Sequence, residues 1–302
     1  MHIMTANKIL PTTVVGSYPA VRSKGLKSLF NPYASSLETA VGDQIKAGVD
    51  IISTGQVRGD MITSLTSQIP GIRDQNIIGT LKPTQSAMTV DDTKYALSRH
   101  SQVKAMLAGP STIAHALKID TPLYRNRDEV ITDLAKVLAA EALRLQDTGI
   151  SIFQIDEPIL STGIADMNTA QRAVREITKN LKVTTCIHVC GDIGGVIDSL
   201  LKMPVNIIDL EFSCNKENLE CVGAKEKNFA DKRIGFGAID STDTNIDSVE
   251  AVKSRIEKGV ELFGAEKLLI DPDCGLRMHT RETAFGKLSN MCAAADEVRR
   301  EL

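Results

Sequence analysis

The chain has 302 residues and a formal net charge of −3 at pH 7, with 42% hydrophobic and 24% charged residues. This balance is typical of a soluble enzyme and excludes the basic surface that binds nucleic acid or an anionic membrane. No run approaches the roughly 18 apolar residues of a membrane span, and the N-terminus lacks the charged-then-apolar order of a signal peptide. Six cysteines without paired spacing predict a reducing, cytoplasmic location rather than a disulfide framework.

Short apolar runs alternate with longer helical patterns along the whole chain. Eight runs predict buried strands, at residues 12–19, 49–56, 102–110, 151–158, 183–191, 206–212, 233–240 and 267–275. Strands that are apolar on both faces and spaced by helices form a parallel sheet. The pattern therefore predicts an α/β fold, a (β/α)8 TIM barrel, with residues 1–302 as a single domain. A doubly wound open sheet is the alternative, but the phosphate fingerprint expected after its first strand is absent.

Three of the helical patterns are the clearest. They cover Asp128 to Asp147, Ser248 to Phe263 and Arg281 to Leu302, with apolar residues at helical spacing. Gly149 lies just past the first of them, where a left-handed cap is expected.

Residues 71–100 interrupt this alternation between the second and third strands. The segment is polar and contains Pro83 and a strand-like run at Ser86 to Val90. Because long connections in compact domains are often functional, we predict an excursion over the barrel mouth, the ring formed by the carboxyl ends of the strands. A passive surface flap is the alternative.

Three predicted strands carry side chains that bind soft metals. His188 and Cys190 lie two residues apart on one strand, so their side chains point to the same side. Glu211 ends the next strand, where a buried carboxylate is costly without a partner, and Cys274 ends another. Two thiolates with an imidazole and a carboxylate suit zinc better than calcium or magnesium. Without the CxxC spacing of a structural finger, these residues predict a reactive Zn²⁺ site, with core packing of the His–Cys pair as the alternative.

Motifs spread through almost the whole chain resemble the catalytic domain of the cobalamin-independent methionine synthase family, in that family's order. They are TTVVGSYP from Thr12, GQVRGDM from Gly55, QIDEP from Gln154, HVC from His188, IDLE ending at Glu211, GFGAID from Gly235 and DPDCGL from Asp271. In this resemblance the family's four zinc ligands correspond to His188, Cys190, Glu211 and Cys274. HVCGD is also similar to the zinc methyltransferases that move methyl groups between corrinoids and thiols.

The resemblance implies a zinc-dependent methyltransferase that methylates a small thiol, with homocysteine as the expected substrate and methionine as the product. A free alkyl thiol has a pKa of about 8.5 and is mostly protonated at pH 7, whereas its thiolate is the nucleophile. Coordination to zinc deprotonates the thiol and orients the sulfur toward the methyl group. Glu211 would be the ligand that yields to the substrate sulfur, and its alternative role is that of a partner of His188.

Four residues match family positions that hold the amino-acid part of the substrate. Asp156 would pair with the amino group, while Gly16 and Ser17 would hold the carboxylate. Gln56 stands where the family has a Glu that helps to bind the amino group, so a charge-assisted contact becomes a neutral hydrogen bond. Two alternatives stay open: Glu157 could point inward in place of Asp156, or Asp156 could cap a helix.

Two charged residues of the GQVRGDM motif, Arg58 and Asp60, follow the second strand. For both of them, a role at the site and an ordinary exposed loop position are equally open.

The region after GFGAID departs from the family. Asp240 matches the family's Asp, but Thr242 replaces the histidine proposed as a proton relay and cannot titrate near pH 7. The chain also has no tryptophan and lacks the amino-terminal barrel that helps the long enzymes to hold folate. We therefore expect a corrinoid, free or bound to a corrinoid protein, as methyl donor, because it departs without a proton. Asp240 is the predicted catalytic residue, since a folate donor would require it as the acid.

Three other functions compete with this interpretation. Coenzyme M, a thiol without an amino group, is the second candidate acceptor. A uroporphyrinogen-decarboxylase-like activity would need a basic pocket and no metal. A non-catalytic zinc-binding partner subunit of a corrinoid protein would need no substrate thiolate. Metal analysis together with a thiol-alkylation assay separates these functions.

Overall fold

The computed structural model describes residues 8–21, 31–225, 229 and 231–302. The expectation that the N-terminus is not a signal peptide concerns residues that lie partly outside these ranges. The main strands are β3 (Lys104–Ala108), β5 (Ile152–Asp156), β6 (Thr184–Val189), β7 (Ile207–Glu211), β8 (Arg233–Ile239) and β9 (Leu268–Pro272). The α-helices are α2 (Ala34–Ala47), α3 (Met61–Thr66), α4 (Val90–Arg99), α5 (Pro110–Ala116), α6 (Arg127–Gln146), α7 (Met167–Thr178), α8 (Ile197–Leu200), α9 (Lys216–Gly223), α10 (Val249–Phe263) and α11 (Arg281–Glu301). Two 3-10 helices are η1 (Pro158–Thr162) and η3 (Ala265–Lys267).

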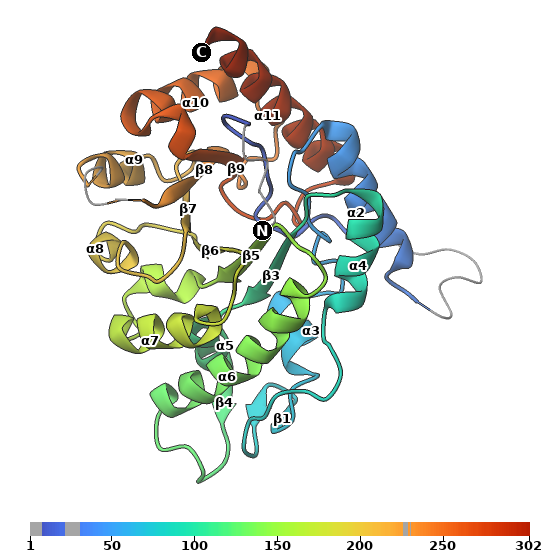
Figure 1. Cartoon of the computed structure of the whole chain (residues 1–302), viewed down its shortest axis with the longest axis vertical. Helices are drawn as coiled ribbons and strands as arrows, with labels where there is room; N and C mark the ends of the chain where they lie inside the picture. The colour runs from blue at the N-terminus through green and yellow to red at the C-terminus, as the bar shows by residue number, and fades with distance from the viewer. Residues whose placement is uncertain (1–7, 22–30, 226–228, 230) are drawn as a thin grey trace.

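The main sheet is parallel and closes on itself. Strands β3, β5, β6, β7, β8 and β9 pair in this order, each parallel to the next. Two N-terminal segments complete the ring through single parallel bridges: Thr12 to Ile270, Thr13 to Ile51, and Ile52 to Val103. Figure 1 shows the helices arranged around these strands. The predicted TIM barrel is therefore confirmed, with its first two strands reduced to bridges.

The barrel interior changes from apolar to polar along the strands. Its floor is a separate cluster of buried side chains: Ile51, Ile152, Cys186, Ile207 and Leu269. Because side chains alternate across a strand, the next inward layer lies two residues further along, and it is polar: Gln154, His188, Asp209 and Asp271. The larger core lies between the sheet and the helices. The strands were expected to be apolar on both faces. Their outer face is apolar, but their inner face is apolar at the floor of the barrel and polar in the next layer.

The three clearest helical predictions are confirmed as α6, α10 and α11. Their first turns are capped by Asn126, Ser248 and Thr280, whose side-chain oxygens accept backbone N–H groups. Gly149 has a φ of +93°, which allows the chain to turn from α6 into β5. Within the described ranges no helix is long and apolar enough to cross a membrane. The cytoplasmic location stays a prediction.

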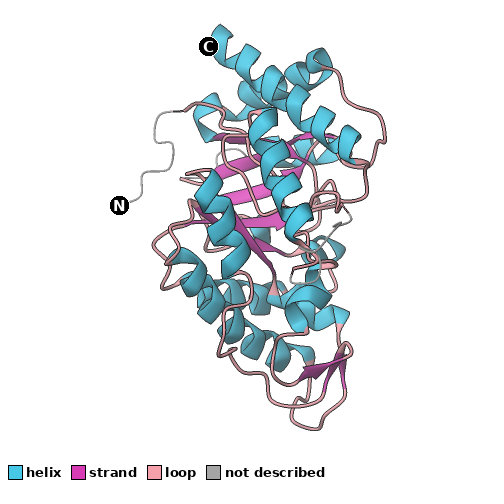
Figure 2. Cartoon of the chain, turned by 90° about the vertical axis from the view of Figure 1, so that its right-hand side faces the viewer, coloured by secondary structure: helices cyan, strands magenta, loops and turns pink. Residues whose placement is uncertain are grey.

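Part of residues 71–100 builds a small sheet outside the barrel. Strands β1 (Ile72–Arg73) and β2 (Asn76–Ile77) are antiparallel, and β2 pairs in parallel with β4 (Lys118–Ile119). Figure 2 shows this sheet at one end of the molecule, apart from the main sheet. The strand-like run from Ser86 is not a strand, because it leads directly into α4, which packs against α2 and α6. That the segment covers the mouth, and that the chain is one domain, stay predictions.

A buried carboxylate of α6 overrides the strand propensity of this run. Glu141 is fully buried, and its Oε1 accepts the backbone N–H groups of Met88 and Thr89, each at 2.8 Å. Arg144 lies one turn later, donates to the carbonyl oxygen of Thr84 at 2.6 Å and pairs with Glu141 at 3.3 Å. The backbone groups that a strand would pair with another strand are here paired with side chains of α6.

We expect Glu141→Ala to lower the free energy of unfolding by about 2–4 kcal/mol, because the buried N–H of Met88 and the partly buried N–H of Thr89 lose a charged acceptor, and a buried N–H costs about 1–3 kcal/mol when unpaired. Urea unfolding at pH 7 measures this change. The matched control is Glu176→Ala on the surface of α7, whose exposed ion pair with Lys179 should contribute less than about 1 kcal/mol. Equal changes for the two variants would contradict the anchoring role of Glu141.

Candidate active site

Three of the four predicted metal ligands meet at the carboxyl ends of β6 and β9. His188 lies near the end of β6, Cys190 follows that strand, and Cys274 follows β9. The ligand atoms of these three residues all lie within 4.8 Å of one another. The barrel topology brings together residues that are more than 80 positions apart in the sequence.

His188 is oriented as a metal-binding histidine would be. Its side chain is buried, and its Nδ1 lies 3.2 Å from the Oδ1 of Asp209. An Nδ1–H that donates to a carboxylate leaves the lone pair on Nε2, and this Nε2 has no hydrogen-bond partner among the described residues. A buried, unpaired imidazole nitrogen beside two thiols fits a zinc ion, which binds nitrogen and sulfur in this combination.

The two thiols differ in their readiness to ionise. The hydrogen bond from Cys274 is the main cause that lowers the pKa of Cys190, although burial and the nearby Glu211 oppose it. The same hydrogen bond is the main cause that raises the pKa of Cys274, and burial raises it further. Cys190 is therefore the thiol that ionises first, and its thiolate is the form that binds metal.

Glu211 stands beside the three ligands but outside their 4.8 Å set. It ends β7 and is mostly buried, and its Oε2 accepts the N–H of Gly191 at 2.8 Å and the amide of Asn215 at 2.5 Å. The carboxylate thus contacts the residue that follows Cys190. Its assignment as the fourth ligand stays a prediction.

The two acids of the QIDEP motif have separate surroundings. Glu157 is fully buried and accepts the N–H groups of Ser111 (2.9 Å) and Thr112 (2.7 Å), at the beginning of α5. Asp156 ends β5, is paired in register with His188, and accepts hydrogen bonds from Gln154 at 2.7 Å and Gln56 at 3.3 Å. Glu157 therefore holds a helix, while Asp156 lies beside His188, one of the predicted metal ligands.

The residues expected to bind the amino acid lie near one another. A methyl group added to Gly16 would come within 3.0 Å of the Oε1 of Gln56, and Gln56 contacts Asp156. The backbone carbonyl of Ser17 accepts the N–H of Leu276 at 2.8 Å, and the side chain of Ser17 packs against Gly275. Gln56 has a φ of +43°, a conformation that costs energy for a residue with a side chain and is common at functional sites.

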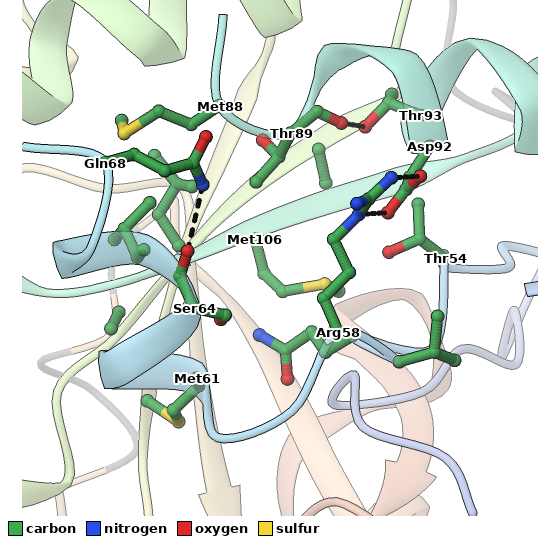
Figure 3. A pocket seen from close by; sticks show the side chains of 16 residues that line it. Thr54, Arg58, Met61, Ser64, Gln68, Met88, Thr89, Asp92, Thr93 and Met106 are labelled. Carbon is green, nitrogen blue, oxygen red and sulfur yellow. Dashed lines mark hydrogen bonds and ion pairs between the residues drawn. The ribbon is translucent and has the colours of Figure 1, made fainter. Parts of the chain in front are cut away.

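Arg58 and Asp60 both have structural contacts. Arg58 makes a bidentate pair with Asp92 of α4, at 2.6 and 2.7 Å, beside a cavity of about 60 Å³ that Gln56 also lines (Figure 3). Asp60 caps α3 by accepting the N–H of Ile62 at 3.0 Å. The cavity is too small for a drug-sized ligand, so these residues shape the loop that carries Gln56.

Asp240 lies at the carboxyl end of β8 and faces its own loop. Burial raises the pKa of this carboxyl group, but hydrogen bonds from Thr242 and Asp243 outweigh burial and lower it below the usual range. Asp240 is consequently ionised near pH 7 and is poorly suited to donate a proton. His279, which the sequence did not single out, lies nearby with its Nε2 2.8 Å from the carbonyl oxygen of Ser241.

Charged groups on the strands around His188 were not predicted from the sequence patterns. Lys104 is fully buried, with its Nζ 3.9 Å from the Oδ2 of Asp209. Burial raises the pKa of Asp209, but its interactions with His188, which include a hydrogen bond, and with Lys104 outweigh burial and lower the pKa. Burial, and then the charge of Asp209, raise the pKa of Asp271 well above its usual range. The signal that could have found this cluster is the presence of charged residues inside otherwise apolar strands.

We expect Asp209→Asn to weaken zinc binding by about 10- to 100-fold, because His188 loses the carboxylate that fixes its orientation and raises its basicity. Competition with a chromophoric chelator measures the affinity. The exposed Asp198→Asn serves as control, since its side chain pairs with Lys225 at the surface and lies outside the predicted site. Unchanged zinc affinity in Asp209→Asn would show that this contact does not support the metal site.

Comparison with known proteins agrees with this geometry. The model of the family described as cobalamin-independent synthase, catalytic domain, matches residues 10–297. A methionine synthase of Methanothermobacter marburgensis is 42% identical, covering 95% of this chain and 99% of its own length. That of Methanocaldococcus jannaschii is 38% identical, covering 94% and 97%. A solved B12-independent methionine synthase from Shewanella sp. W3-18-1, in complex with selenomethionine, has a TM-score of 0.87 at 25% identity, covering 97% of this chain and 99% of that one.

These comparisons correct one expectation. The matching family and the Shewanella protein are described as independent of cobalamin or B12, which conflicts with a corrinoid or a corrinoid protein as methyl donor. The expectation rested on residues that the chain lacks, namely tryptophan and a histidine at the position of Thr242. A missing side chain shows only which group does not act, and it does not identify the donor.

Proposed function

Because this chain belongs to the cobalamin-independent methionine synthase family, we propose that it transfers a methyl group to the sulfur of homocysteine at a zinc ion, giving methionine. The chain is a methyltransferase. The observation that carries the proposal is the cluster of His188, Cys190 and Cys274, whose ligand atoms lie within 4.8 Å and in which the buried His188 Nε2 has no partner among the described residues.

His188, Cys190 and Cys274 would hold the zinc ion, with Glu211 as the fourth ligand. When bound, zinc would supply a positive charge that deprotonates the substrate thiol and keeps it nucleophilic at neutral pH. Asp209 keeps the Nε2 of His188 directed toward this site by holding its Nδ1. Glu211 is the ligand best suited to yield to the substrate sulfur, because its oxygen has alternative partners in Gly191 and Asn215.

Asp156, Gln56, Gly16 and Ser17 would bind the amino-acid part of homocysteine. Asp156 supplies a carboxylate for the ammonium group, and Gln56 adds a neutral amide beside it. The backbone at Gly16 and the hydroxyl of Ser17 would hold the α-carboxylate. The related Shewanella protein was solved with selenomethionine, an amino acid that carries a methylated selenium, which supports an amino-acid site of this kind here.

We assign Asp240 a role as an anion at the rim of the site. Its lowered pKa favours the ionised form, so it can orient a positively charged group or accept a proton but is a poor general acid. Coenzyme M remains the second candidate acceptor, and it would leave Asp156 without a positively charged partner. No contact among the described residues of the barrel interior favours coenzyme M over homocysteine.

The decisive experiment supplies a methyl donor that needs no activation by the protein. Zinc-loaded protein is incubated with homocysteine and methyl iodide, and methionine is measured by mass spectrometry; the thiolate sulfur forms the new S–C bond as iodide departs with the C–I electrons. We expect methionine formation above the rate of the same mixture without protein; it should fall to that uncatalysed rate when the zinc is chelated and recover when zinc is added. A rate that is equal with and without zinc, or faster with coenzyme M than with homocysteine, would contradict the proposed function.

A further inference from the structure

Gln154 lies inside the barrel between the two predicted halves of the amino-acid site. Its side chain is fully buried, and its Nε2 donates to the carbonyl oxygen of Val15 at 2.8 Å and to the Oδ1 of Asp156 at 2.7 Å. Among the described residues, its Oε1 accepts a single weak, 3.8 Å contact, from the thiol of Cys186. Both N–H groups of the amide are therefore used: one binds the segment that follows the Thr12 and Thr13 bridges, and the other binds the end of β5.

These two acceptors belong to the two ends of the amino-acid site. Val15 directly precedes Gly16 and Ser17, the residues expected to hold the α-carboxylate. Asp156 is the residue expected to hold the ammonium group. Because the two N–H bonds of a planar amide diverge at a set angle, a single Gln154 side chain links the positions of both groups.

The two amides that contact Asp156 have unequal bonds. Gln154 is fully buried and binds Oδ1 at 2.7 Å, whereas Gln56 is partly exposed and reaches Oδ2 at 3.3 Å. The shorter bond fixes the rotation of the carboxylate. The longer bond is the weaker one, so Oδ2 is the oxygen that can accept an ammonium group.

We propose that Gln154 is a positioning residue that sets the spacing between the carboxylate-binding and ammonium-binding groups, and that it thereby makes the site selective for α-amino-acid thiols. The inference rests on the proposed function, since it assumes that Asp156 binds the substrate's ammonium group. Among the described residues, the side chain of Gln154 bonds to Val15, Asp156 and Cys186 and to none of the predicted metal ligands, so it acts through Asp156 and Val15. A purely structural buried amide would affect folding and would not change the choice between thiols.

The test replaces Gln154 by methionine, which keeps the length of the side chain and removes both donors. Rates of methyl transfer from methyl iodide are measured on the zinc-loaded protein with homocysteine and with coenzyme M, which has no amino group. We expect the KM for homocysteine to rise about ten-fold, which corresponds to the loss of one or two hydrogen bonds. The KM for coenzyme M should change less than about two-fold. The control is Cys186→Ala, which removes only the weak contact to Oε1 and should leave both KM values unchanged.

A double variant shows whether Gln154 acts through Asp156. If it does, Gln154→Met combined with Asp156→Asn should lose hardly more homocysteine turnover than Asp156→Asn alone, because coupled residues are not additive. Fully additive losses, or equal losses for both thiols, would overturn the inference. If Gln154→Met does not fold, Gln154→Asn takes its place, since it keeps an amide that is too short to reach both acceptors; it should show the same selective loss.

The outcomes separate this inference from the proposed function. A wild-type protein that binds no homocysteine by calorimetry overturns the proposed function and this inference with it. A wild-type protein that binds and methylates homocysteine, together with a Gln154→Met variant of unchanged selectivity, overturns the role of Gln154 alone.

Discussion

Replacing Cys190 or Cys274 by serine should remove most of the zinc and nearly all methyl transfer. The wild-type protein should hold about one zinc ion per chain, and a hydroxyl is a much poorer ligand for zinc than a thiolate. Without the metal, a substrate thiol with a pKa of about 8.5 is only about 3% ionised at pH 7, which by itself costs about 30-fold in rate. Loss of the orientation of the sulfur adds to this, so we expect a total loss of more than about 100-fold.

Metal content by atomic emission and methionine formation by mass spectrometry measure this effect. Cys221→Ser is the matched control, because Cys221 is a free thiol on α9 and does not belong to the cluster of His188, Cys190 and Cys274. Both site variants should stay folded, since their side chains lie at the rim of the barrel and outside the apolar core. Retention of a full equivalent of zinc in both variants would exclude these cysteines as ligands.

Asp156→Asn should reduce the use of homocysteine by about 10- to 100-fold while changing the use of coenzyme M far less. A hydrogen bond to a charged group contributes about 1.5–3 kcal/mol, and the neutral amide cannot make one with an ammonium group of equal strength. Asparagine has nearly the same shape as aspartate, so the packing beside His188 and Gln154 should be preserved.

The measured quantity is the ratio of kcat/KM for homocysteine to that for coenzyme M. Asp128→Asn, an exposed change on α6, is the matched control and should leave this ratio unchanged. An equal fall in kcat/KM for both thiols would remove Asp156 from amino-group recognition and would assign it a general role at the metal site.

The strands and long helices could be predicted because they depend on local patterns. The runs that contain His188, Glu211 and Cys274 are apolar on the face that packs against the helices, and each is followed by a polar turn or helix. Once the strands are parallel, their carboxyl ends must meet at one mouth, so the clustering of His188 with Cys190 and Cys274 follows from topology.

Residues 71–100 show where local pattern fails. The run at Ser86 to Val90 has the composition of a strand, yet Glu141 and Arg144 of α6 provide the partners for its backbone. Those partners lie more than 50 positions away in the sequence, so no local window could have included them. The strand-like run is therefore a loop that leads into α4.

The sequence by itself determined the order of the strands, the parallel barrel and which side chains are candidates for binding a metal. Only the tertiary structure decided that Asp156 lies beside His188 while Glu157 holds α5, and that Glu211 bonds to Gly191 and Asn215. The reason is physical: hydrophobic periodicity specifies which face of a strand is buried, through many similar and weak contributions. The direction of a buried polar side chain depends instead on one or two specific hydrogen bonds, and their partners come from strands that are distant in the sequence.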